Sequence, residues 1–234
     1  MALLKRGPTR ELPTGHDPAP DDCGDGFFGG LFAPPSCAVC GEAGYRGLCP
    51  DCRSEMEELF DPRPFLCREG NGFADGAFAL FRYASPMVRR LLFDLKRNGF
   101  RDSVDLFGAF VRRQVLPEEI LSADLVTFCP RTLKARGERG FDQSLLLAEK
   151  VSEILGIPAE RLLLRSRPAR AQHALSSEDR RKNVTGTFSA ARPLSGEHIL
   201  LVDDVVTTGA TIWEAARVLK GAGAMRVQVL CLAH

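Results

Sequence analysis

Apolar residues along most of this chain occur either in short continuous runs or three to four positions apart. Short apolar runs predict buried strands, and apolar residues three or four positions apart predict helices that pack on them. We expect strands over residues 77–83, 123–129, 161–165, 198–204 and 225–233. We expect helices over residues 53–60, from Ser85-Pro86 to Arg97, from 102 or 103 to 115, and over 211–220. A further helix is expected to be capped by Asp142 and to run to Leu155. Strands that alternate with helices from residue 123 onward indicate a parallel sheet with crossover helices.

The first part of the chain lacks these apolar patterns. Residues 1–26 are rich in Pro, Gly and Asp and hold no apolar signal core, so we predict a disordered segment. No run approaches the roughly 18 apolar residues that cross a membrane, and a cytosolic protein is expected. The predicted organisation is a disordered segment over 1–26, a metal-binding module with a linker over 27–75, and an α/β domain over 76–234.

Four cysteines carry the metal prediction. Cys37, Cys40, Cys49 and Cys52 form two C-x2-C pairs separated by eight residues. Four thiolates at this spacing can surround one zinc ion, and a complete set of sulfur ligands is typical of a structural site rather than a catalytic one. The remaining four cysteines (Cys23, Cys67, Cys129 and Cys231) are interpreted as buried or incidental thiols.

The segment ILLVDDVVTTGAT, residues 199–211, carries the second chemical signal. Ligands of open α/β sheets bind at the carboxyl ends of the strands, where Asp203 and Asp204 are expected. Small residues and a helix N-terminus favour a bound phosphate. Two carboxylates beside a phosphate fit sugar hydroxyls or a cation, so we predict a phosphorylated sugar held with Mg2+. The phosphate turn is formed by Thr207, Thr208, Gly209, Ala210 and Thr211.

Charge is unevenly spread along the chain. Residues 1–80 carry 7 Lys and Arg against 13 Asp and Glu, whereas residues 81–234 carry 24 against 17. Four cations lie between the strand at 123–129 and the next helix, where arginine forks could bind pyrophosphate or simply be solvated. They are Arg131, Lys134, Arg136 and Arg139. A second basic group, at residues 180–182, suits phosphates of a sugar or of a nucleic acid, or an ordinary helix surface. Of the histidines, only His173 lies in a motif-like segment.

The segment VDDVVTTGAT resembles the fingerprint of type I phosphoribosyltransferases, which bind 5-phosphoribosyl 1-pyrophosphate (PRPP). The resemblance implies that Asp203 and Asp204 contact the ribose hydroxyls and that residues 207–211 bind the 5′-phosphate. Residues 30–234 as a whole resemble the ComF family, which is competence-associated and carries an N-terminal zinc ribbon. That resemblance rests on the four-cysteine module, LKRNGF, CPRTLKARGERGFDQSLLLAE, AQHALSSEDRRKNVTGTF and the fingerprint.

The chain departs from the ComF pattern at four places. TFCPRTL replaces a VPVPL-type strand end, Asp142 replaces the asparagine of R-G-F-N-Q, and Ala171-Gln172 replaces a Pro-Gln pair. Cys67 stands where a second cysteine pair is common. The first three changes fall near the expected site, so they bear on substrate and activity more than on fold.

Three functions remain compatible with these patterns. The first is a phosphoribosyltransfer enzyme that releases pyrophosphate, with Asp203, Asp204 and Arg131 in catalysis and Arg136 and Arg139 among the binding residues. The second is a single-stranded DNA-handling protein for DNA uptake, with a helicase-like partner and with PRPP or a nucleotide as regulatory ligand. The third is a PRPP-sensing scaffold whose zinc ribbon docks another protein. Salt-dependent DNA affinity would favour the second, and an intact PRPP turn speaks against the third.

Overall fold

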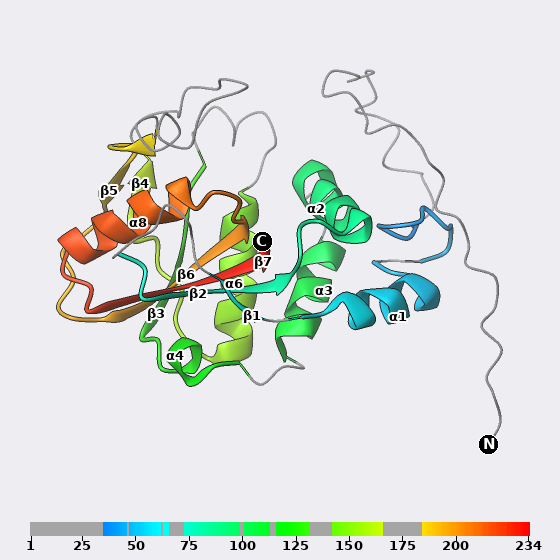
Figure 1. Cartoon of the computed structure of the whole chain (residues 1–234), viewed down its shortest axis with the longest axis horizontal. Coiled ribbons are helices and arrows are strands. Elements are labelled where there is room, and N and C mark those ends of the chain that lie inside the picture. The colour runs from blue at the N-terminus through cyan, green and yellow to red at the C-terminus, as the bar shows by residue number, and fades with distance from the viewer. Residues whose placement is uncertain are drawn as a thin grey trace.

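A computed structural model describes residues 35–45, 47–61, 63–65, 73–98, 101–112, 116–131, 142–165 and 184–234. The segment expected to be disordered, 1–26, lies outside these residues. A five-stranded sheet forms the centre of the described part (Figure 1). Its strands, in spatial order, are β1 (Arg63–Pro64), β2 (Gly76–Phe81), β7 (Arg226–Ala233), β6 (His198–Val205) and β3 (Leu125–Phe128). All neighbours are parallel except β1, which runs antiparallel to β2.

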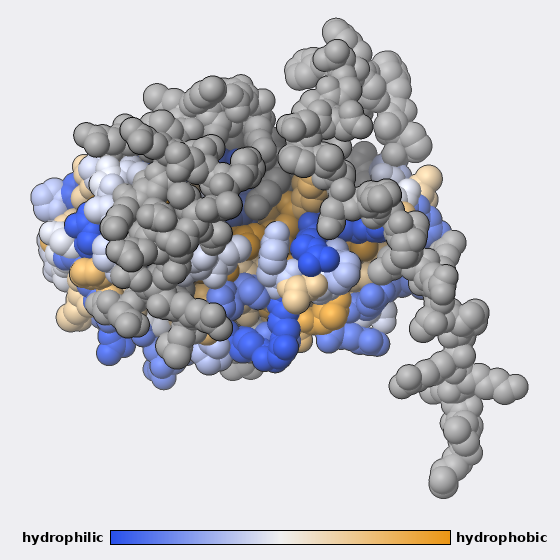
Figure 2. Space-filling view, turned by 45° about the horizontal axis from the view of Figure 1, so that its top comes forward, coloured by the Kyte–Doolittle hydropathy of each residue, from blue (hydrophilic) through white to orange (hydrophobic). Residues whose placement is uncertain are grey.

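Successive residues of the central strands enter two different cores. On β6, Leu200 and Val202 join the core shared with α2 (Pro86–Asn98), α3 (Arg101–Arg112) and α6 (Gln143–Leu155). Ile199 and Leu201 join the core shared with α8 (Ala210–Gly221). This alternation follows from the period of two in a strand, and it explains the continuous apolar run of a sheet buried on both faces. Figure 2 shows hydrophobic residues gathered near the middle of one face, with hydrophilic ones along its lower margin.

The four-cysteine segment belongs to the first of these cores. Helix α1 (Pro50–Leu59) carries Cys52 and Met56, which cluster with Leu80 of β2 and Phe107 of α3. Next to α1, the Phe60 ring stacks on that of Phe110 with centroids 5.5 Å apart. In Figure 1, α1 accordingly lies against α3. The module and the sheet therefore share buried surface, and the boundary expected between residues 75 and 76 stays a prediction.

The α/β fold with a mostly parallel sheet is confirmed, but the strand expected over 161–165 departs from it. Only β4 (Leu163–Arg165) forms, and it pairs antiparallel with β5 (Phe188–Ala190) in a separate two-stranded sheet. Val126 makes an isolated parallel bridge with Ala159, and the chain then leaves the edge of β3. Pro158 lacks a donor N–H, which limits pairing at this edge.

Element ends also differ from those expected. Helix α1 begins at Pro50 rather than at residue 53, since proline suits the first helical position. Helix α8 begins at Ala210, one residue early, and a short helix α4 (Glu118–Leu121) was not expected. Within the described residues, no helix combines the length and apolar character that crossing a bilayer requires.

Candidate functional site

Asp203 and Asp204 lie near the carboxyl end of β6, and both are more than nine-tenths buried. Ser144 of α6 donates its hydroxyl hydrogen to Oδ1 of Asp203 across 2.8 Å. The side chains also accept from the backbone of the strand, because the N–H groups of Asp204 and Val205 donate to Asp203 and Asp204, respectively. These contacts hold two carboxylates at the end of a parallel strand, which is the position where α/β sheets bind ligands.

The predicted phosphate turn follows directly. Gly209 has a φ of 86°, a left-handed conformation that residues with a Cβ rarely adopt. It is the residue before α8, and its carbonyl oxygen accepts the N–H of Trp213 at 2.7 Å. Thr208 Oγ1 lies 3.4 Å from the Ala210 nitrogen, close to the first turn of α8. A sharp turn at a twelve-residue helix N-terminus presents backbone N–H groups to an anion.

Arg131 brings a cation to the carboxylates. It follows β3, and its guanidinium Nη2 lies 4.0 Å from Oδ2 of Asp204. Its backbone N–H donates to Oδ2 of Asp142 at 2.9 Å. The other predicted basic residues and His173 lie outside the described residues. They are Lys134, Arg136, Arg139 and the basic group at 180–182.

Asp142 was expected to cap α6, and in part this is wrong. It occupies the residue before the helix, yet its side chain makes no capping hydrogen bond. The carboxylate accepts the Arg131 N–H instead, while Oδ1 is buried with no hydrogen-bond partner among the described residues. The first amides of α6 thus keep no side-chain cap, and Asp142 fixes the chain that carries Arg131.

Arg165 is a half-buried cation that the sequence did not single out. It ends β4, its Nη1 donates to the Pro130 carbonyl oxygen at 3.4 Å, and its guanidinium lies over the Phe188 ring. Burial lowers the pKa of Arg165, although the guanidinium keeps its charge. Burial also raises the pKa of Cys129 at the end of β3, and Asp203 adds to that rise. Cys129 is therefore a neutral thiol here. A charged residue ending a short apolar strand is the one signal that could have revealed Arg165.

Glu214 connects helix α8 to the chain segment that precedes β5. It is fully buried and accepts the Gly186 N–H at 2.6 Å. Arg217 donates to both of its carboxylate oxygens at 2.8 Å. The bonds fix the chain that enters β5 to the helix that begins at the phosphate turn.

Together, these contacts place two chemically different groups, carboxylates and a phosphate-binding turn, at the carboxyl ends of the strands. Buried carboxylates that can accept from hydroxyl groups or bind a divalent cation lie beside an uncapped turn that can bind phosphate. Arg131 and Arg165 supply positive charge on the β3 side. This arrangement suits an anionic ligand that also carries hydroxyl groups.

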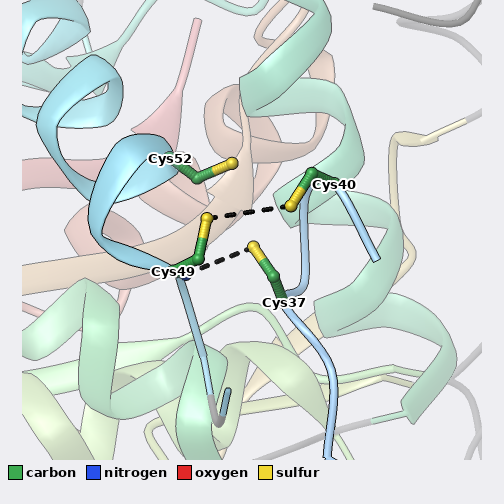
Figure 3. A group of neighbouring side chains, drawn as sticks. All are labelled: Cys37, Cys40, Cys49 and Cys52. Atoms are coloured by element: carbon green, nitrogen blue, oxygen red, sulfur yellow. Dashed lines mark hydrogen bonds between the residues drawn. The ribbon is translucent and has the colours of Figure 1, made fainter. Parts of the chain in front are cut away.

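The four-cysteine cluster is built on a turn, which carries Cys37 and Cys40, and on the start of α1, which carries Cys49 and Cys52. Gly41 and Gly47 have φ values of 78° and 81°, which let the backbone turn beside the ligand pairs. Figure 3 shows the sulfur atoms of both pairs directed toward one point. All four sulfurs lie within 4.8 Å of one another, with Cys40 Sγ and Cys49 Sγ 3.7 Å apart.

This geometry fits a zinc ion. A tetrahedron of sulfurs about 2.3 Å from zinc has edges of about 3.8 Å, close to the measured separation. Burial acts to raise the pKa of the Cys37 thiol, but backbone N–H groups of Cys40 and Cys49 donate to its sulfur and lower that pKa to about 7. Burial raises the pKa values of Cys49 and Cys52 in the same cluster, so a cation that binds there must displace their protons.

The chain is similar to known proteins in both sequence and domain type. Residues 142–234 match the model of the phosphoribosyl transferase domain. The chain is 38% identical over 212 residues to the DNA utilization protein YhgH of Escherichia coli K12, which is 84% of this chain and 88% of that protein. It is 34% identical over 123 residues to Competence protein F of Haemophilus influenzae, 51% of this chain and 51% of that protein.

Among solved structures, one match is to the allosteric regulatory enzyme of purine biosynthesis. The identity is 26% and the TM-score 0.37, over 55% of this chain and 24% of that one. The chain thus spans about half the length of the competence protein and about a quarter of that enzyme.

Proposed function

Since this chain belongs to the ComF/YhgH family of competence and DNA-utilization proteins and carries a phosphoribosyltransferase domain, we propose that it binds PRPP together with Mg2+ and transfers the phosphoribosyl group to an acceptor. The proposal places the ligand at the carboxyl ends of β6 and β3. The observation that carries it is the pair of buried carboxylates, Asp203 and Asp204, just before the glycine turn. The Asp204 carboxylate lies 4.0 Å from the Arg131 guanidinium.

Each part of the site has a task in this reaction. Asp203 and Asp204 accept hydrogen bonds from the ribose hydroxyls, and the 207–211 turn binds the 5′-phosphate through its amides and threonine hydroxyls. Arg131 binds the pyrophosphate, with Arg136 and Arg139 as further proposed contacts. The bond from C1 to the pyrophosphate oxygen breaks, pyrophosphate leaves with the electron pair, and the acceptor forms the new bond to C1.

Mg2+ fits this site because the donors beside the turn are buried carboxylate oxygens, the hard ligands that it prefers. When bound, it would neutralise negative charge on the pyrophosphate. The chain itself supplies orientation and charge: Ser144 fixes the carboxylate of Asp203, and Asp142 fixes the backbone of Arg131. Zinc in the four-cysteine cluster is proposed to be structural, because four sulfurs leave no open coordination position.

Calorimetric titration of the whole protein with PRPP, with and without Mg2+, tests the proposal. We expect Mg2+-dependent binding, and we expect ribose 5-phosphate to bind more weakly because it lacks the pyrophosphate. Pyrophosphate release is then measured with candidate acceptors. A protein that does not bind PRPP under either condition would refute the proposed site.

Replacing Arg131 with glutamine is expected to weaken PRPP binding by about 10- to 100-fold, because a charge-assisted contact to pyrophosphate is lost. Ribose 5-phosphate, which has no pyrophosphate, should bind within about twofold of its original affinity. Calorimetry with both ligands measures the difference. Arg226→Gln, an exposed cation at the amino end of β7, is the matched control. Equal losses for both ligands would contradict the assignment of Arg131.

The relatives are named for DNA utilization and competence, which supports the handling of DNA as a second candidate function. We propose that the DNA is then single-stranded and that PRPP or a nucleotide is a regulatory ligand. A helicase-like uptake protein would then be the partner. The surplus of cations in residues 81–234 supports this candidate.

If the chain handles DNA in this way, its affinity for a short oligothymidylate should fall steeply with salt. The logarithmic slope should be about −0.7 for each phosphate neutralised. Fluorescence anisotropy over a salt series measures the slope. A slope near zero, or no binding at low salt, would leave DNA handling without support.

A further inference from the structure

Two aromatic rings lie beside the phosphate turn, on the side away from Arg131. The imidazole of His234, which follows β7, stacks on the Phe65 ring with centroids 4.1 Å apart and an interplanar angle of 16°. His234 is exposed and Phe65 is half-buried. The His234 backbone N–H donates to the Phe81 carbonyl oxygen at 3.1 Å, which fixes the end of β7 to β2.

The histidine ring is also attached to the turn. Its Nδ1 lies 2.8 Å from the carbonyl oxygen of Val206, the residue directly before Thr207. A carbonyl oxygen only accepts, so Nδ1 carries the proton and donates it. In the neutral ring, Nε2 is then an acceptor. Figure 1 shows the chain end labelled C close to the segment that follows β6, in agreement with this bond.

The two neighbours of β6 therefore differ in chemistry at their carboxyl ends. On the β3 side the residues are charged, with Arg131 and Arg165 next to Asp142. On the β7 side, the equivalent position holds two stacked aromatic rings, those of His234 and Phe65. Pyrophosphate requires the first environment. A planar heterocycle, which gains from stacking on an aromatic face, suits the second.

The dimensions of a nucleotide allow its phosphate to lie at the turn while its base reaches the β7 side. Phosphate and base are separated by a single ribose ring, so a sugar phosphate at the turn has its C1 within reach of the neighbouring strands. Val205 pairs with Ala233, which places His234 directly beside the residues that begin the turn. A base that reacts at C1 from the side opposite the departing pyrophosphate would approach from β7.

We propose that the stacked pair of His234 and Phe65 forms the surface for the acceptor, and that this acceptor is a nucleobase that stacks on the exposed His234 ring. The proposal rests on the proposed function, because it takes the 207–211 turn as the 5′-phosphate site. The same chemistry could be supplied by a free base or by a base within a single strand.

Calorimetry on the whole protein separates these sources. Adenine and uracil are titrated into the protein in the presence of Mg2+ and ribose 5-phosphate, which occupies the sugar site but cannot react because it lacks the pyrophosphate. A short oligothymidylate is titrated in parallel. We expect His234→Ala to weaken the binding of at least one of these ligands by about fivefold or more, as loss of one base–aromatic stack does. His234→Phe retains a ring and should restore most of the loss in stacking.

A matched control lies directly before the same strand. Met225, exposed at the amino end of β7, is replaced by alanine and should leave all affinities unchanged. Dependence of adenine or uracil binding on His234 identifies a free base, and dependence of oligothymidylate binding identifies a base in a strand. Affinities that are the same in wild type and His234→Ala would overturn the inference.

The failure of this inference is distinguishable from failure of the proposed function. PRPP titration of His234→Ala serves as the internal comparison. If PRPP binds wild type and His234→Ala equally while no base binds either protein, the stacking surface is refuted and the PRPP site stands. If PRPP does not bind wild type, the proposed function itself fails, whatever the bases do.

Discussion

Replacing both Asp203 and Asp204 with asparagine is expected to weaken Mg2+-dependent PRPP binding about a hundredfold or more, because hydrogen bonds to two charged acceptors are lost. The substitution keeps the size of both side chains. It also keeps one oxygen on each, so the contacts from Ser144 Oγ and from the Asp204 and Val205 amides can persist. The loss should therefore appear in ligand affinity and hardly in stability.

Calorimetric titration with PRPP measures the affinity, and a thermal unfolding curve checks that the variant is folded. Asp124→Asn is the matched control, because its carboxylate lies at the amino edge of the sheet and accepts the His198 N–H at 2.8 Å. This control should bind PRPP as wild type does. A double variant that binds PRPP with unchanged affinity would show that the carboxylates hold neither the ribose nor a cation that the ligand needs.

Replacing Cys52 with serine is expected to lower the free energy of unfolding by more than about 4 kcal/mol, since loss of a structural metal belongs to the largest single-residue effects. The reason is the shared core. Cys52 and Met56 pack in the same cluster as Phe107, so loosening the module disturbs α3 and the sheet face beneath it. Chelation of the metal in wild type should act in the same direction.

Denaturant unfolding measures the stability, and elemental analysis counts the zinc per chain. Cys231→Ala is the control, since it removes a buried thiol of β7 that lies outside the four-cysteine cluster. It should keep its zinc, and its free energy of unfolding should fall by only about 1–2 kcal/mol. Wild-type protein that contains no zinc and is indifferent to chelators would contradict the role given to the cluster.

The sheet and the metal cluster could be predicted because their signals are local. The apolar run at 198–204 ends in two acids, and strand period and turn chemistry agree there. The first C-x2-C pair lies on a turn and the second spans the start of α1, and the short spacing within each pair brings the four sulfurs together. Membership of the ComF family, inferred from these motifs, is confirmed by the relatives.

The rest depends on contacts between distant segments. Nothing near Asp142 in the sequence indicates that its carboxylate accepts the Arg131 N–H in place of a helix amide. The pairing of β4 with β5 joins segments separated by more than twenty residues, and three-residue strands carry too few alternating positions to be recognised. The stack of Phe65 on His234 likewise joins the residues that follow β1 and β7, two strands that are separated in the sheet by β2.

Trp213 gives the site an optical reporter. It is the only tryptophan of the chain, and its backbone N–H donates to the carbonyl oxygen of Gly209 in the phosphate turn. Its indole meets the Phe73 ring edge-on with centroids 5.5 Å apart. The half-buried indole lies one helical turn from the place where a phosphate would bind. Emission excited selectively from tryptophan thus comes from this one location, so the arrival of a ligand can be followed in time on the unlabelled native chain.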